Sequence, residues 1–199
     1  MRLPAAFQVR PTRLEADFEG DGRTEHLALS MGQLQIETAG QIRWQSPAAW
    51  QVAQAGVADL NHDGLPEAEL LVWRPFQPWP VDQWLPTGGR IKEHHNAAGL
   101  ACHLILIGWQ RGQLRERWAG SALADPIKHF AVAALTRDGK EFLVTLEADY
   151  HDLPSTPARQ LKVWEWNGFG FSLVAASAGR FTQLSIGRQT VGPDFILAP

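Results

Sequence analysis

The 199-residue chain has a single cysteine, Cys102, so no disulfide can form within it. No run approaches the roughly 18 consecutive apolar residues of a membrane-spanning helix. The 18 Lys and Arg residues are scattered and are outnumbered by 21 Asp and Glu, which argues against a nucleic-acid partner. The opening residues 1–4 lead quickly into polar sequence and do not resemble a signal peptide. We expect a single globular domain, residues 1–199, with no membrane span.

Recognisable catalytic motifs are also missing. There is no Walker loop, dinucleotide-binding fingerprint or Gly-x-Ser-x-Gly turn. Residues 150–152, Tyr-His-Asp, would supply a base and an orienting carboxylate, but no nucleophile accompanies them. His94 and His95 follow Glu93, yet neighbours on an extended chain point to opposite faces and no third metal ligand is evident. We therefore expect a protein without enzymatic activity.

Two Asp-rich segments, residues 17–25 and 59–67, stand out instead. Both have oxygen-bearing side chains at positions one, three, five and nine: Asp17, Glu19, Asp21 and Glu25, then Asp59, Asn61, Asp63 and Glu67. The seventh residues, Arg23 and Leu65, would add a backbone carbonyl, and a glycine at position six permits the sharp turn. Ca²⁺ takes six to eight such oxygen ligands. The pattern predicts two calcium sites; the alternative for each segment is a plain Asp-Gly turn.

The segments are not EF-hands, because position twelve is Ala28 in one and Leu70 in the other, where an EF-hand has a bidentate Glu. The flanking residues, 12–16 and 26–30 around the first loop and 51–58 and 68–73 around the second, are strand-like. A metal loop that joins two strands and ends on a carboxylate at position nine resembles the FG-GAP/VCBS repeats. Those repeats form the calcium-binding blades of integrin-α-type β-propellers and of many bacterial surface proteins.

The spacing between Gly22 and Gly64 suits a four-stranded blade of about 40–45 residues. We expect an all-β, small or incomplete propeller-like array of antiparallel blades, with units at about 7–46, 51–118 and 128–176 and a partial unit at 180–199. The third unit retains only Asp138 as a loop carboxylate, so this loop is expected to hold no metal. Residues 7–10 are expected to pair with the tail and close the ring. One short helix is allowed within residues 122–130.

An insertion rich in Pro and Trp, residues 74–98, interrupts the second unit between its second and third strands. A binding surface there would use these aromatic and basic residues at its start and within it: Trp73, Arg74, Phe76, Trp79 and Trp84. Trp and Arg are enriched at interface hot spots, and Trp also stacks on sugars. The alternative is a structural lid whose aromatic side chains cover the end of the array.

The resemblance implies a non-catalytic, calcium-stabilised module for binding or scaffolding, with a protein or a cell-surface glycan as partner. Two alternatives stay open. One is an accessory subunit whose incomplete ring is completed within a larger assembly or homo-oligomer. The other is a polysaccharide-acting enzyme or glycan-binding domain that uses residues 150–152 or the insertion. Because calcium is abundant outside the cytoplasm, the loops favour a secreted, periplasmic or cell-surface location.

Overall fold

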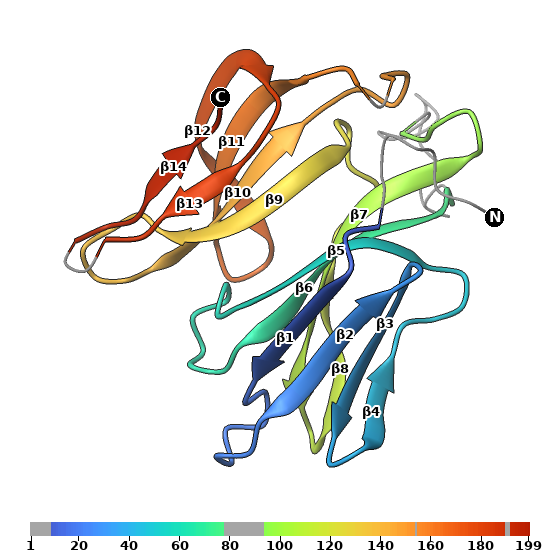
Figure 1. Cartoon of the computed structure of the whole chain (residues 1–199), viewed down its shortest axis with the longest axis vertical. Coiled ribbons are helices and arrows are strands. Elements are labelled where there is room, and N and C mark those ends of the chain that lie inside the picture. Colours follow the sequence, from blue (N-terminus) through green and yellow to red (C-terminus); the bar gives the residue numbers. More distant parts are fainter. Residues whose placement is uncertain (1–8, 78–93, 154, 190–191) are drawn as a thin grey trace.

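The computed structural model describes residues 9–77, 94–153, 155–189 and 192–199, and all regular structure within these ranges is β-strand (Figure 1). The all-β prediction is confirmed, whereas the helix allowed within residues 122–130 is absent because β9 already begins at Ile127. No helix in the described ranges is long and apolar enough to cross a membrane. The strands are β1 (Thr12–Ala16), β2 (Glu25–Ser30), β3 (Gln33–Thr38), β4 (Gln41–Gln45), β5 (Gln51–Ala58), β6 (Glu67–Pro75), β7 (Leu100–Gln110), β8 (Gln113–Ala119), β9 (Ile127–Ala134), β10 (Glu141–Glu147), β11 (Ala158–Trp166), β12 (Phe171–Phe181), β13 (Ser185–Gly187) and β14 (Phe195–Leu197).

The strands form four antiparallel sheets in strict sequence order. The first sheet is β1–β4, the second β5–β8 and the third β9–β12, while β13 and β14 form a C-terminal hairpin. Tight turns produce this order, since most neighbours are joined by short connections that contain glycine in the left-handed region, as at Gly32 and Gly168. The sheets span residues 12–45, 51–119 and 127–181, so the third sheet ends five residues beyond the expected unit 128–176, and the hairpin begins at Ser185.

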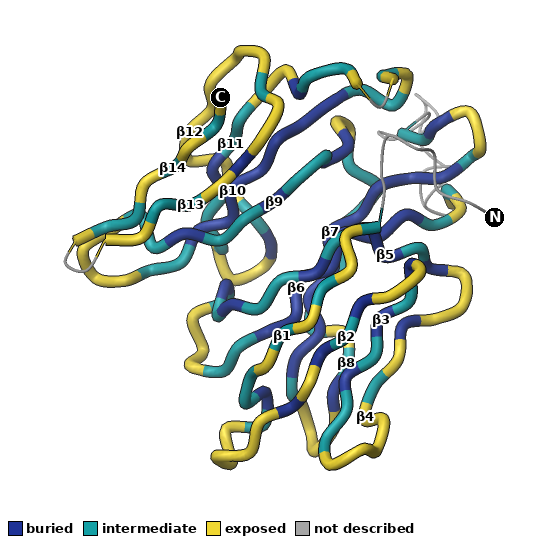
Figure 2. Tube along the Cα trace, in the orientation of Figure 1, coloured by how far each residue is buried: buried dark blue, intermediate teal, exposed yellow. Residues whose placement is uncertain are grey.

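The sheets stack face to face, and apolar side chains fill the spaces between them. Leu27 and Ile36 of the first sheet meet Leu70 of the second in one cluster. Leu71 and Trp73, on the other face of the same strand, join Phe130 and Leu143 of the third sheet in a second cluster, and a third cluster lies between the third sheet and the hairpin. The second sheet is therefore covered on both faces, which is why β6 and β7 are buried almost throughout (Figure 2).

The first strands of successive sheets lie beside one another, because β1 contacts β5, β5 contacts β9, and β9 contacts β13. The side chain of Gln54 on β5 bonds both backbone groups of Phe130 on β9, with Nε2 2.7 Å from the carbonyl oxygen and Oε1 3.2 Å from the amide nitrogen.

The described strands form no closed barrel or ring. The predicted pairing of residues 7–10 with the tail is wrong for Arg10, whose amide donates to Ala53 of β5 at 2.9 Å.

Candidate functional site

The two Asp-rich loops share three internal hydrogen bonds. In each, the first aspartate accepts the amides of positions five and six: Asp17 accepts from Asp21 and Gly22 at 3.1 and 2.8 Å, and Asp59 from Asp63 and Gly64 at 3.0 and 2.9 Å. The fifth residue then accepts the amide of the seventh, from Arg23 in one loop and Leu65 in the other, at 2.9 and 3.1 Å. The repeated pattern shows that the two segments adopt one loop conformation.

Both loops are anchored and lie close together. The second residue of each, Phe18 or Leu60, is buried in a hydrophobic cluster and anchors the loop to the core. A methyl group added at Gly20 would lie only 2.7 Å from Cδ2 of Leu65, so the first loop contacts the second. The amide of Asp59 donates to Glu141 of β10 at 2.7 Å and thereby ties the second loop to the third sheet.

The carboxylates at position nine differ in their partners. Glu25, 1% exposed, accepts from the amide of Phe18 at 2.9 Å with one oxygen and from the Thr38 hydroxyl at 3.1 Å with the other. Glu67, 2% exposed, accepts from the Asn61 side-chain amide with Oε1, while its buried Oε2 has no hydrogen-bond partner among the residues that the structure describes. Only the second loop therefore has a buried carboxylate oxygen that still needs a partner.

The electrostatics of Glu67 follow from this arrangement. Burial, followed by repulsion from Asp63 and Asp59, raises the pKa of its carboxyl group to about 8. A cation bound by the same oxygens would replace the lost hydration and offset the repulsion. The donor set of the second loop thus fits a hard cation such as Ca²⁺.

Each loop also receives an arginine from the last strand of its own sheet. Arg43 of β4 approaches Glu19 at 2.8 Å, and Arg117 of β8 approaches Asp63 at 2.7 Å while donating to the carbonyl of Trp109. These pairs offset part of the loop charge without a metal. Within the described ranges no three His, Cys, Asp or Glu side chains form a ready-made metal cluster. A bound Ca²⁺ would therefore draw the carboxylates inward and use Asn61, the Leu65 carbonyl and water as further ligands.

The third loop differs, as the sequence indicates. Asp138 is exposed and accepts from the Lys140 amide at 3.3 Å and from the Thr136 hydroxyl. The Gly139 amide donates to the Thr136 carbonyl at 3.1 Å, which closes an ordinary tight turn. With one carboxylate, this turn offers no comparable donor set.

The residues predicted to form a binding surface at the insertion do not share one environment. Trp73 is a correction: it is 0% exposed on β6 and packs edge-on against Tyr150, with ring centroids 5.8 Å apart, so it belongs to the core. Arg74 lies over the Trp50 ring at 5.8 Å, and half-buried Phe76 lies 5.3 Å from the His95 ring. Trp79 and Trp84 fall outside the described residues.

The side chains of Tyr150 and Asp152 have separate hydrogen-bond partners. The Tyr150 hydroxyl donates to the Leu123 carbonyl at 2.7 Å and accepts from the Cys102 amide at 3.2 Å. Burial raises the pKa of this hydroxyl beyond its usual range. Asp152 pairs with Arg159 at 2.5 Å, while His151 is exposed. The Tyr150 hydroxyl thus links the segment at Leu123 to strand β7, and Asp152 bonds Arg159 instead of orienting His151.

Two features escaped the sequence reasoning. Glu69 on β6 is 0% exposed between the second and third sheets, neither carboxylate oxygen has a hydrogen-bond partner, and burial raises its pKa well above the usual range. A carboxyl inside the apolar run of residues 68–73 was the available signal. The second feature is an apolar cavity of about 250 Å³ between the same sheets, with Trp118, Trp164 and Phe171 in its wall.

The chain matches no known protein-family model, and no curated protein matches it significantly.

Proposed function

We propose that the protein is a non-catalytic, calcium-stabilised module for binding or scaffolding, built as an incomplete propeller-like array. The observation that carries this proposal is the repeated loop conformation, in which equivalent carboxylates stand at the same positions after the first strand of two successive sheets. A plain turn needs only one Asp and one Gly. The further carboxylates, and above all the unpartnered oxygen of Glu67, have a physical use if a cation binds.

The propeller-like assignment is supported by the four-stranded sheets in sequence order, their face-to-face stacking and the contacts between their first strands. Propeller blades share these relationships. An accessory role in a larger assembly is supported by β12, a sheet edge of 11 residues whose members are exposed between its two terminal phenylalanines. Exposed edges of this length invite pairing with another strand.

As a binding site for the module, the apolar cavity between the second and third sheets suits an apolar or aromatic group. Trp118 and Phe171 belong to its wall, and they stack edge to face with each other and with Trp166 behind them, with centroids 5.3–5.8 Å apart. A protein side chain or the apolar face of a sugar is the expected occupant. The insertion stays a second candidate surface, which the paired substitutions Trp79→Ala and Trp84→Ala test through loss of partner binding with an unchanged melting temperature.

The deciding experiment is thermal unfolding with calcium and with a chelator. Binding to the native state alone adds about 2.7 kcal/mol per site at a hundredfold excess over Kd. The double variant Asp21→Ala with Asp63→Ala should lose most of the calcium-induced shift in melting temperature. Asp138→Ala is the matched control, because it removes a carboxylate from the corresponding turn of the third sheet, and it should keep the full shift. A wild-type melting temperature that calcium does not move would refute the proposal.

A further inference from the structure

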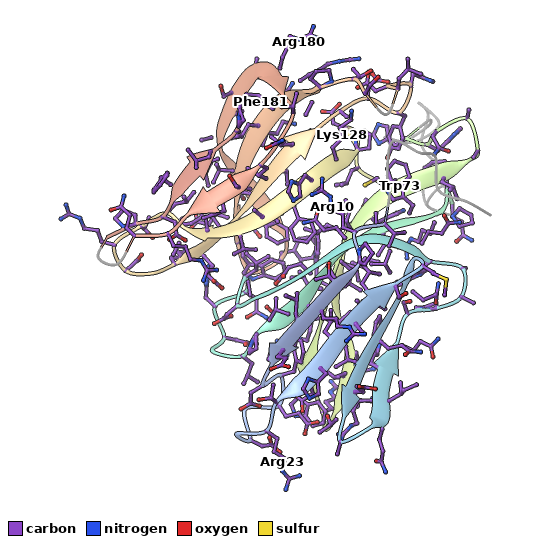
Figure 3. All side chains as sticks on the ribbon, in the orientation of Figure 1. Arg10, Arg23, Trp73, Lys128, Arg180 and Phe181 are labelled. Carbon is purple, nitrogen blue, oxygen red and sulfur yellow. The ribbon has the colours of Figure 1, made fainter. Side chains whose placement is uncertain are left out.

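A basic cavity of about 310 Å³ lies at the start of β9, and no residue of the two Asp-rich loops lines it. It is lined chiefly by Arg10, Lys128, His129, Ser155, Thr156 and Phe181. Arg10 immediately precedes the β1 region and Lys128 is the second residue of β9, whereas each Asp-rich loop follows the end of a first strand. Figure 3 labels Arg10, Lys128 and Phe181 around the third sheet.

The described residues that line the basic cavity include Arg10 and Lys128 and no carboxylate. Neither Arg10 nor Lys128 forms an ion pair within the described part of the chain. The nearby acid Asp152 forms its ion pair with Arg159, at 2.5 Å, so part of its negative charge is already offset. Arg10 and Lys128 therefore bring two basic groups to the wall of one cavity, and burial lowers the pKa of the Lys128 ammonium.

Local contacts hold these groups in place. The Lys128 ammonium donates to the Thr156 carbonyl, and Nη1 of Arg10 lies 3.4 Å from Nε2 of His129. Burial, and next the charge of Arg10, lower the pKa of His129 to about 4, so the imidazole is neutral at pH 7. In a neutral imidazole one ring nitrogen donates a hydrogen bond and the other accepts one, so with Nε2 accepting from Arg10 the Nδ1–H is the donor.

We propose that the basic cavity binds a phosphate group, either as the free ion or as a small phosphomonoester. Two charges on Arg10 and Lys128 match the charge of a phosphate dianion, and guanidinium and ammonium groups are its usual protein donors. The hydroxyls of Ser155 and Thr156 stand in the same wall, and the Phe181 ring offers an apolar surface for the organic part of an ester. The volume lies at the lower end of the range for small-molecule sites.

Isothermal titration of the full chain tests the proposal with three probes: inorganic phosphate, phenyl phosphate and uncharged phenol. Saturable binding of either phosphate, with none of phenol, is expected. Equal affinity for both phosphates assigns the site to the free ion, and tighter binding of phenyl phosphate assigns it to an ester. Absence of saturable binding of both phosphates would overturn the proposal.

Three variants localise the binding. Arg10→Gln and Lys128→Gln should each weaken it by about tenfold or more, because each removes a charge-assisted contact. Arg13→Gln is the matched control, since it removes one positive charge from an exposed position of β1 outside the cavity, and it should bind as the wild type does. Equal weakening of phosphate binding in all three variants would mean that the protein attracts phosphate through its overall charge, and it would overturn the assignment of phosphate to the basic cavity.

Two further measurements separate this site from other causes. Melting temperatures report whether each variant folds. If Lys128→Gln does not fold, the test rests on Arg10→Gln, because Arg10 is exposed. Bound phosphate should raise the pKa of His129 from about 4, measured by NMR titration, because it offsets the charge of Arg10. Titrations with calcium and with chelator should agree, so failure of the proposed calcium function would leave this inference standing.

Discussion

Asn61 donates its side-chain amide to one oxygen of Glu67, and the other oxygen of that carboxylate is buried without a partner. The corresponding carboxylate of the first loop, Glu25, has a hydrogen-bond donor on each oxygen. Two loops with one backbone conformation thus differ at their most buried acid. Substitution of Glu67 and of Glu25 should therefore change the stability of the protein by different amounts.

Glu67→Gln should keep the metal-free stability at pH 7 within about 1 kcal/mol of the wild type, because a pKa of about 8 leaves the buried carboxyl largely uncharged at that pH. The same change should abolish the calcium response of the second loop. Glu25→Gln should instead cost about 1–2 kcal/mol, since one of its two accepting oxygens becomes a donor group. Denaturant unfolding with chelator measures both values, and an equal loss in the two variants would contradict the assigned difference.

Magnesium should stabilise the protein less than calcium at the same concentration. Mg²⁺ requires near-octahedral geometry at short distances and keeps its waters, whereas each loop offers oxygens from one short segment at flexible distances. Melting curves in matched calcium and magnesium buffers provide the comparison. Equal shifts by the two ions would argue against a calcium-selective loop.

Trp73→Ala should destabilise the protein by about 3–5 kcal/mol, as expected for removal of a large buried ring. Its edge-on contact with Tyr150 and its place between the second and third sheets leave no room for relaxation without a cavity. Phe76→Ala is the control on the same segment, because Phe76 is only half-buried and should cost about 1 kcal/mol. A small loss at Trp73 would show that the ring is not part of the core.

His103 should make stability fall under acidic conditions. Burial lowers its pKa to about 4 in the folded protein, against 6.5 for the unperturbed side chain. Between these pH values the unfolded chain binds the proton and the folded chain does not, so folding stability is full above about 6.5 and decreases as pH falls toward 4. The loss attributable to this residue should be about 1–3 kcal/mol.

The measurement compares unfolding free energies between pH 4 and 7 for the wild type and His103→Gln, and the variant should show the shallower decline. His151→Gln is the control because His151 is exposed. A decline of equal depth in the wild type and His103→Gln would refute the contribution of His103.

The strand pattern and the loop positions could be predicted because both depend on residues close together in the chain. Asp59 and Gly64 are five positions apart, and the hydrogen bond from the Gly64 amide to the Asp59 carboxylate forms the turn between them. The Asn167-Gly168 pair likewise marks the hairpin between β11 and β12, where Asn167 bonds the Gly170 carbonyl at 2.9 Å. Trp73 was misassigned because an apolar residue beside an insertion has the same local sequence whether it faces solvent or a second sheet.

The sequence by itself determined an all-β chain with two like loops, since turn chemistry, residue period and side-chain oxygens act over a few residues. Only the tertiary structure decided that the second sheet is covered on both faces, and so that Glu69 is buried within it. It also placed Arg10 beside Lys128 and His129 in one cavity. These relationships join residues far apart in the chain, such as Arg10 and Lys128, which are 118 positions apart (128 − 10). They arise from sheet stacking, which is driven by nondirectional burial of apolar surface and leaves no local mark in the sequence.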